Sequence, residues 1–214
     1  MKLLIVSDEE DPLLWDYYRP ERLEGVSLIL SAGDLKASYL NFLVTMGNRP
    51  LLYVHGNHDT AYEEAPPEGC VCVEDRLVIV NGLRILGLGG SFRYNGEPLQ
   101  YTERQMALRV FRAGCLCRLA GGLDILLTHA PPRGWGDMED LPHRGFSCFL
   151  PLLDRWKPRY LLHGHIHQRY QVNGQRVRQY GETTIINVNG SYTLELPDPV
   201  PSGKEPPFSR LFRL

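Results

Sequence analysis

Three histidines alternate with other residues in the stretch LLHGHIHQ, at positions 163, 165 and 167. They are notable because the whole chain has only seven histidines. Alternate residues of an extended strand share one face of it, and a row of imidazoles would pack poorly against a hydrophobic core. Two interpretations follow: a histidine-rich strand end facing water, or ligands of a site completed by residues from elsewhere in the chain.

Other residues suited to metal or acid–base chemistry recur in the same kind of place. Five short apolar runs, at 2–6, 26–31, 50–54, 123–128 and 159–163, each end in a polar cluster. The polar residues are Asp8, Glu10, Asp34, Asn57, His58, Asp59, His129, His165 and His167. Carboxylates mixed with imidazoles and an amide, without thiolates, suit manganese, iron or zinc better than a structural zinc–cysteine site.

The elements that must position these residues are short buried strands. Each run is rich in Leu, Ile and Val and is bounded by Gly, Asp or Pro, which is typical of strands. Helical patterns follow at 38–47, 102–119 and 145–156. This alternation predicts an α/β protein whose strand-to-loop junctions gather at one sheet edge, where ligands bind. Glycines that allow close backbone approach precede three of the polar residues, at Gly33, Gly56 and Gly164.

Two segments indicate antiparallel strands, so the sheets are predicted to be mixed. Residues 70–91 and 169–196 alternate apolar and polar positions around Asn-Gly pairs at 81–82, 173–174 and 189–190, which are typical of hairpin turns. Residues 11–23 could line the mouth of a site with Trp15 and Tyr18, but an amphipathic helix is the favoured prediction. We expect a single domain over residues 1–196 and a proline-rich C-terminal tail, 197–214, packed on the surface.

Composition sets the class of protein. The chain of 214 residues is 43% hydrophobic and 22% charged, which is typical of a globular protein. Its formal net charge is −2, so it lacks the overall positive charge that would predict strong nucleic-acid binding. Its five cysteines form no CxxC pair and predict free, mostly buried thiols in a reducing compartment. No apolar stretch approaches the ~18 residues of a membrane span. A cytoplasmic protein without a membrane partner is expected, and its oligomeric state is left open.

The order of the polar blocks resembles that of the calcineurin-like metallophosphoesterases. The blocks are Asp8-Glu9-Glu10, Gly33-Asp34, Gly56-Asn57-His58-Asp59, His129 and Gly164-His165-Ile166-His167. They run in the family's order over most of the chain, and GNHD together with GHIH is a specific combination. The resemblance implies two mixed β-sheets packed as a sandwich flanked by helices. It also implies hydrolysis of phosphomonoesters, phosphodiesters or phosphoanhydrides.

The resemblance further implies two divalent transition metal ions, with Mn²⁺ favoured and iron or zinc as alternatives. It assigns Asp8, Asp34 and His167 to the first ion, and a bridging Asp34 with Asn57, His129 and His165 to the second. A hydroxide that bridges the ions would attack phosphorus in line. His58 would assist the leaving group, with Asp59 holding its ring. His163 and His55 are interpreted as packed or hydrogen-bonded histidines outside the site.

Glu10 departs from the family pattern, because the first motif usually reads D-x-H. Three accounts are open: Glu10 ligates the first ion, it binds that ion through water, or the first site is degenerate. The last account leads to an alternative function, a catalytically weak sensor or scaffold that binds metal or nucleotide. The presence of His58, which metal binding does not require, favours the enzyme. An HD-type phosphohydrolase is disfavoured because strands flank the blocks.

Two loops beside these blocks are candidates for substrate binding. Residues 87–105 present Arg93, and residues 131–146 present His143 and Arg144 directly after His129. Arginine matches the geometry of a phosphate group, although these residues could instead be ordinary surface cations. The expected partner is a small phosphorylated substrate, with nucleotides included.

Overall fold

The computed structural model describes residues 1–167, 175–197 and 214, and its first sheet has strand order β13-β1-β2-β3-β4. Strands β1 (Lys2–Ser7), β2 (Val26–Ser31), β3 (Leu51–Tyr53) and β4 (Val71–Cys72) run parallel. The edge strand β13 (Gly190–Glu195) pairs antiparallel with β1. The carboxyl ends of β1, β2 and β3 therefore lie at one edge.

The second sheet has strand order β11-β12-β10-β9-β6-β5. Its four inner strands are parallel: β12 (Thr183–Asn187), β10 (Tyr160–His163), β9 (Ile125–Thr128) and β6 (Leu83–Leu88). Both edge strands, β11 (Val177–Tyr180) and β5 (Leu77–Val80), are antiparallel to their neighbours. A small parallel ladder joins β7 (Ser91–Phe92) to β8 (Gln100–Tyr101).

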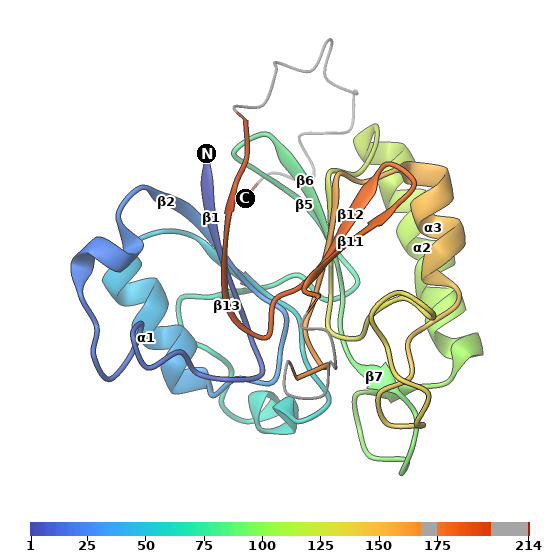
Figure 1. Ribbon diagram of the computed structural model, residues 1–214, viewed down its shortest axis with the longest axis horizontal. Helices are drawn as coiled ribbons and strands as arrows, with labels where there is room; N and C mark the ends of the chain where they lie inside the picture. Colours follow the sequence, from blue (N-terminus) through green and yellow to red (C-terminus); the bar gives the residue numbers. More distant parts are fainter. Residues whose placement is uncertain (168–174, 198–213) are drawn as a thin grey trace.

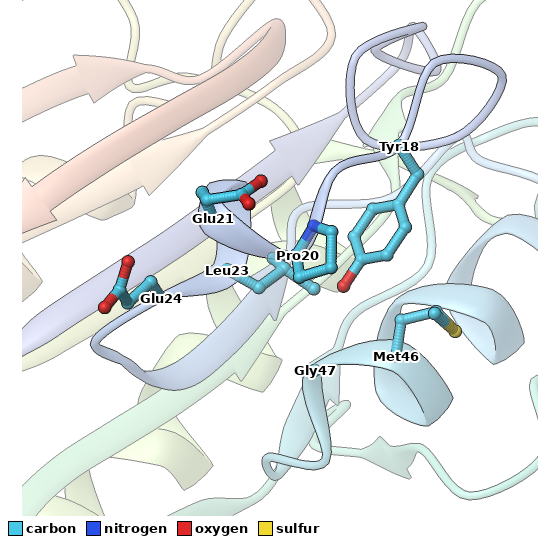
Figure 2. A pocket seen from close by; sticks show the side chains of 7 residues that line it. All are labelled: Tyr18, Pro20, Glu21, Leu23, Glu24, Met46 and Gly47. Carbon is cyan, nitrogen blue, oxygen red and sulfur yellow. The ribbon is translucent and has the colours of Figure 1, made fainter.

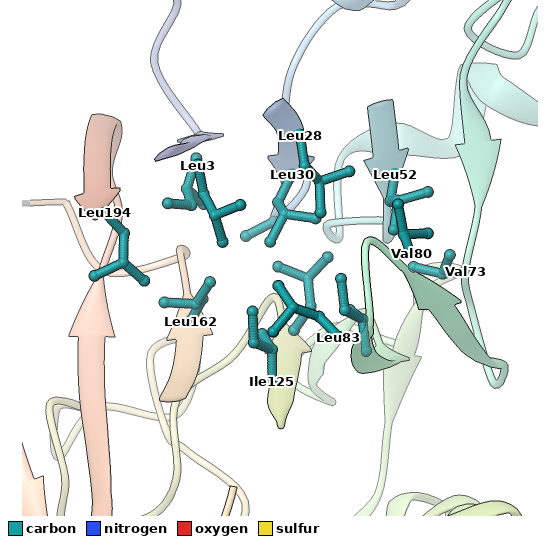
Figure 3. Packing of buried hydrophobic residues seen from close by; sticks show 14 of the residues in the cluster. Leu3, Leu28, Leu30, Leu52, Val73, Val80, Leu83, Ile125, Leu162 and Leu194 are labelled. Atoms are coloured by element: carbon teal, nitrogen blue, oxygen red, sulfur yellow. The ribbon is translucent and has the colours of Figure 1, made fainter. Parts of the chain in front are cut away.

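The two sheets face each other and helices cover their outer faces (Figure 1). α1 (Ala37–Gly47) lies beside the first sheet, and α2 (Glu103–Ala120) and α3 (Phe149–Trp156) lie beside the second. Figure 3 shows apolar side chains from both sheets meeting between them, among them Leu3, Leu30, Ile125 and Leu162. Further buried clusters lie under α1 and under the α2–α3 pair. This is the four-layer α/β sandwich that the sequence predicted.

Local sequence explains where the longest helix begins and ends. The Thr102 side chain accepts from the Gln105 backbone amide while the Gln105 side chain accepts from the Thr102 amide, which is a capping box. The helix ends at Gly121, whose φ of 76° is left-handed and therefore favours glycine. These signals set the two ends of α2.

Two expectations from the sequence are wrong. Residues 11–23 form turns and a short 3₁₀ helix, η1 (Pro20–Leu23), not an amphipathic α-helix. Trp15 and Tyr18 in that segment pack edge-on against Phe42 of α1. The Asn189-Gly190 pair joins strands of different sheets, because β12 pairs with β10 while β13 pairs with β1. The hairpin turn lies instead between β11 and β12.

The remaining expectations have mixed outcomes. The Asn81-Gly82 hairpin between β5 and β6 is confirmed. All five cysteines are free, but of these only Cys117 is fully buried and Cys115 is exposed, so "mostly buried" is wrong. The Asn173-Gly174 pair and nearly all of the 197–214 tail lie outside the described residues. Within the described residues, no helix is long and apolar enough to cross a membrane.

Candidate metal centre

The strand ends of both sheets converge on one place. The backbone amide of His165, after β10, donates to both Asp8 carboxylate oxygens, after β1, at 2.9 and 3.0 Å. The Asp8 amide donates to Gly33 O at 3.1 Å, and the Gly164 amide donates to His129 O at 3.0 Å. These contacts join loops that follow four different strands, so the convergence predicted from the sequence is confirmed.

Unusual backbone conformations mark the same loops. Asp8, Asp34 and His165 have φ values of 64°, 58° and 66°, in the left-handed region that residues with a Cβ seldom adopt. Such conformations cluster at functional sites. Gly56 is required for a different reason, because a Cβ there would overlap the Asp34 carboxylate. The polar groups therefore come together through strained backbone at Asp8, Asp34 and His165 and through the absence of a side chain at Gly56.

Four donor atoms from four of these loops face one another. His129 Nε2 lies 3.1 Å from Asn57 Oδ1, 3.1 Å from His165 Nδ1 and 3.3 Å from Asp34 Oδ2. Ligand bonds of about 2.0–2.2 Å to one transition metal ion hold neighbouring ligand atoms roughly 3 Å apart. Asp34, His129 and His165 also satisfy the spacing of a metal-binding group as a set. The residues assigned to the second ion therefore fit a single cation.

Hydrogen bonds behind the donors fix which atoms face the centre. His129 Nδ1 donates to Ala32 O at 2.7 Å, which leaves Nε2 facing the group. His165 Nε2 donates to Pro142 O at 2.8 Å, which leaves the lone pair of Nδ1 facing His129. The backbone amide of His58 donates to Asp34 Oδ1 at 2.8 Å, so Oδ2 is the oxygen nearest His129. Metal-binding histidines are characteristically held by such outer contacts.

Electrostatics show that this group favours a positive charge. Burial opposes protonation of His129, but the Asp34 and Asp8 carboxylates raise its pKa to about 9. Burial alone would raise the pKa of Asp34, but the His129 charge and hydrogen bond lower it to about 2. Burial and the neighbouring His129 charge lower the pKa of His165 to about 3, so it is a neutral donor. A divalent cation bound here would supply the positive charge that the carboxylates otherwise obtain from a proton on His129.

The GNHD loop divides its polar residues between burial and solvent. The His58 side chain is exposed, and its charge lowers the pKa of the neighbouring Asp34. The Asp59 carboxylate is buried, and its Oδ2 accepts from the backbone amides of Gly56 at 2.7 Å and Asp34 at 2.8 Å. The structure therefore corrects the expected contact between Asp59 and the His58 ring. Asp59 instead fixes the loops that carry Asn57 and Asp34.

The residues assigned to the first ion are only partly gathered. The Asp8 carboxylate lies beside the group, and burial raises its pKa. His167 Nδ1 lies 2.7 Å from Glu9 Oε1, and Lys36 Nζ lies 3.4 Å from Glu10 Oε1. His167 and Glu10 thus form contacts away from Asp34, the carboxylate assigned to both ions. His163 is buried and hydrogen-bonded, as expected, and burial lowers its pKa to about 4.

The proposed substrate residues lie on the two expected loops. The His143 ring packs on the His165 ring at 5.6 Å between centroids, while its Nδ1 lies 2.6 Å from Asp140 Oδ2. Arg144 lies over the Phe92 ring, and its buried Nε has no hydrogen-bond partner among the described residues. Arg93 is exposed, and its backbone amide donates to Tyr101 O.

The sequence places Tyr94 on the same candidate loop as Arg93, but it gives no sign of the contact between the Tyr94 hydroxyl and Asn57 Nδ2, which are 3.4 Å apart. The two residues are 37 positions apart, so no local pattern could have indicated this contact. A separate pocket between η1 and α1 contains none of the predicted site residues (Figure 2). Its lining is Tyr18, Pro20, Glu21, Leu23, Glu24, Met46 and Gly47.

A four-layer sandwich that gathers Asp, Asn and His donors at the strand ends of both sheets is the arrangement of a metallophosphoesterase. The chain belongs to the calcineurin-like phosphoesterase family, which matches residues 9–169.

Similar proteins and one solved structure of the same fold are as follows. The chain is 29% identical to human metallophosphoesterase domain-containing protein 1 over 124 residues, which cover 56% of this chain and 36% of that protein. The match thus spans about a third of the human relative. It is 23% identical over 209 residues to an uncharacterized Haemophilus influenzae protein, covering 82% and 88% of the two chains. The crystal structure of a Thermus thermophilus protein matches with a TM-score of 0.60 and 19% identity, covering 88% and 89%.

Proposed function

We propose that the protein is a metal-dependent phosphohydrolase that cleaves a small phosphomonoester or phosphodiester with two divalent ions, of which Mn²⁺ is the preferred metal. The observation that carries the proposal is a group of four donor atoms: His129 Nε2 and the three atoms that lie 3.1–3.3 Å from it. Family membership supports a metal-dependent phosphoesterase. The two ions, the reaction and the substrate are the parts that belong to the proposal.

In this proposal Asp34, Asn57, His129 and His165 hold one ion, while Asp8, Asp34, His167 and Glu10 hold the other. Bound divalent ions supply Lewis-acid chemistry, which acidifies water and neutralises charge on phosphoryl oxygens. Asp59 keeps the Asp34 and Asn57 loops in register through its two backbone contacts. Burial of His129 and Asn57 excludes bulk water from one side of the centre.

The exposed side of the centre would receive the substrate. His58 donates a proton to the leaving oxygen, because its side chain is exposed beside Asp34 and its backbone is fixed by that carboxylate. Arg144, on the loop that follows His129, offers a cation for a phosphate oxygen. Arg93 and His143 lie on the flanking loops and are the further candidates for substrate contacts. A nucleotide is one substrate of this kind.

The test separates chemistry from metal binding. His58→Ala should lower turnover of a chromogenic phosphodiester by about two or more orders of magnitude, with Mn²⁺ content unchanged. His165→Ala should lose an ion, because it removes Nδ1 from the donor group. Elemental analysis beside the Mn²⁺-dependent assay gives both readings. Equal metal loss in the two variants would show that the division of roles is wrong.

A second candidate function is a catalytically weak metal or nucleotide sensor with one ion per chain. It is favoured by the contacts of His167 with Glu9 and of Glu10 with Lys36. A single ion at saturating Mn²⁺, together with phosphodiester and phosphomonoester turnover no faster than in the His58→Ala variant, would decide for it.

A further inference from the structure

The Asn57 side chain, unlike the neighbouring carboxylates, has two chemically different ends, so its orientation matters. An amide presents an oxygen on one side and an NH₂ group on the other, and only the oxygen can bind a cation. The side chain is 5% exposed, so its NH₂ group needs a partner within the protein. Something must therefore hold the amide with Oδ1 toward His129 Nε2.

The partner is the Tyr94 hydroxyl, which accepts from Asn57 Nδ2 at 3.4 Å. Since Oδ1 lies 3.1 Å from His129 Nε2, the amide is held from both ends. A flipped amide would turn its NH₂ group toward the donor atoms of His129 and would lose a ligand. The tyrosine hydroxyl can also donate its own proton toward an oxygen in the exposed part of the site.

The loop that carries Tyr94 is fixed independently of Asn57. The Gln100 side-chain oxygen accepts from the backbone amides of Tyr94, Asn95 and Gly96, at 3.1, 3.2 and 3.3 Å. Gln100 is itself 8% exposed and lies in β8. The base of the loop is tied to the metal loop, because the Gly90 amide donates to His55 O at 2.7 Å. The hydroxyl is therefore presented by a loop of defined shape.

We infer that Tyr94 is a positioning residue that orients the Asn57 amide as a metal ligand. The inference rests on the proposed function only in its assumption that a divalent ion binds at this group. Its clearest consequence is a dependence on the residue at position 57. An aspartate there has two equivalent oxygens and needs no such orientation.

A double-mutant cycle tests this dependence. Tyr94→Phe should weaken Mn²⁺ binding at one site by about 10-fold in calorimetric titration, as is typical when an outer contact of a ligand is removed. In an Asn57→Asp background the same change should alter affinity by less than about 2-fold. Tyr17→Phe is the matched control, since Tyr17 is 71% exposed and lies outside the site. In the metal-free protein, the side-chain amide resonances of Asn57 should shift in Tyr94→Phe and not in Tyr17→Phe.

The outcomes are distinguishable. Wild-type Mn²⁺ affinity in Tyr94→Phe, or the same loss in both backgrounds, would overturn the role of Tyr94 while leaving the proposed function intact. A cycle that behaves as expected in a protein without phosphoesterase turnover would support Tyr94 and refute the proposed function. A wild-type protein that binds no Mn²⁺ would refute both.

Discussion

At the scale of single residues, Glu10 differs most from the family pattern. Its carboxylate lies 3.4 Å from Lys36 Nζ, and the Lys36 side chain is 76% exposed. An exposed ion pair of this kind contributes little to stability. The carboxylate can therefore exchange Lys36 for a divalent ion without a large free-energy penalty, so the observed contact is compatible with a ligand role.

Two substitutions at Glu10 and one at Lys36 test that role. Glu10→Gln should weaken one of the Mn²⁺ sites, because it keeps the shape and removes the charge, whereas Lys36→Met should leave binding unchanged or strengthen it. Glu10→His should raise the charge of the site by one unit and move the rising limb of the pH–rate profile to lower pH. Calorimetry and a pH–rate series measure these effects. Equal Mn²⁺ binding in Glu10→Gln and wild type would exclude direct ligation.

Gly164 has a steric role that is also specific to one residue. A Cβ at this position would overlap the Ser7 hydroxyl and the Asp8 carboxylate. Gly164→Ala should therefore lower the free energy of unfolding by about 1–3 kcal/mol, as overpacking commonly does, and should reduce metal content by displacing Asp8.

Gly114→Ala is the matched control for Gly164→Ala. It lies inside α2, and the nearest heavy atom to its Cβ would be Trp156 Nε1 at 3.8 Å. The added methyl should stabilise the helix by up to about 1 kcal/mol. Urea unfolding and elemental analysis compare the two variants. A harmless Gly164→Ala would show that the Asp8 loop tolerates more space than the structure gives it.

At the scale of elements, one buried carboxylate joins three parts of the fold. Glu74, after β4, accepts from the backbone amides of His55 at 3.3 Å and Gly89 at 3.1 Å. It also forms an ion pair with Arg109 of α2, whose side chain is 8% exposed. Burial alone would raise the pKa of Glu74, but His55 and Arg109 lower it. Glu74 thereby holds both the loop after β3, which carries Asn57, and the turn between β6 and β7 that leads to Tyr94.

Removing that charge should destabilise the protein. Glu74→Gln leaves the buried Arg109 with Asp75 as its remaining carboxylate, so the loss should lie near the lower end of the roughly 3–5 kcal/mol typical of broken buried pairs. Glu182→Gln, which breaks an exposed pair with Lys157, is the control and should leave stability almost unchanged. Thermal unfolding measures both. Similar midpoints for the two variants would contradict a role for Glu74 in joining these elements.

The elements differ in how well the sequence predicted them. The strands after which Asp34 and His129 lie were predictable, because a short apolar run that ends in glycine or polar residues is a local signal. Residues 11–23 were not, because the packing of Trp15 on Phe42 overrides their helical pattern. The Asn189-Gly190 pair was misleading for a related reason. The same dipeptide serves a hairpin and a crossing between sheets, and only long-range pairing distinguishes them.

In the candidate site, too, local features were predictable from the sequence and long-range contacts were not. The donor residues were predictable from their types and their order, whereas the contacts that orient them were not. Glu74 and Tyr94 act through partners 19 and 37 positions away, and neither belongs to a motif. The Asp59 carboxylate was assigned to the His58 ring because carboxylates often hold imidazole rings, but its Oδ2 accepts from the backbone amides of Gly56 and Asp34.

At the scale of the whole molecule, we propose that residues 1–196 act as one domain, because the centre draws on both sheets. Asp34 and Asn57 follow strands of the first sheet, and His129 and His165 follow strands of the second. A ligand that binds the native state alone stabilises it by mass action. Free Mn²⁺ at about 100 times its dissociation constant should add about 2.7 kcal/mol per site to the free energy of unfolding.

Thermal scans with Mn²⁺ and with a chelator measure this stabilisation. The unfolding midpoint should rise with Mn²⁺ concentration and fall back after chelation, and the shift should be smaller in His165→Ala. An unchanged midpoint at saturating Mn²⁺ would show that the ion does not bind preferentially to the folded chain.

The position of the centre between two sheets also has a kinetic consequence. His129 contacts Ala32 across 97 residues of sequence, and His165 contacts Asp8 across 157. Contacts of such long sequence range close only after both sheets have formed and docked, so the donor group should be largely absent from the folding transition state. Interactions that form after that barrier slow unfolding and leave the folding rate almost unaltered. In a chevron experiment, Mn²⁺ should therefore decrease the unfolding rate constant and leave the refolding rate constant unchanged. The ion would then stabilise the protein by slowing its unfolding, after the two sheets have docked.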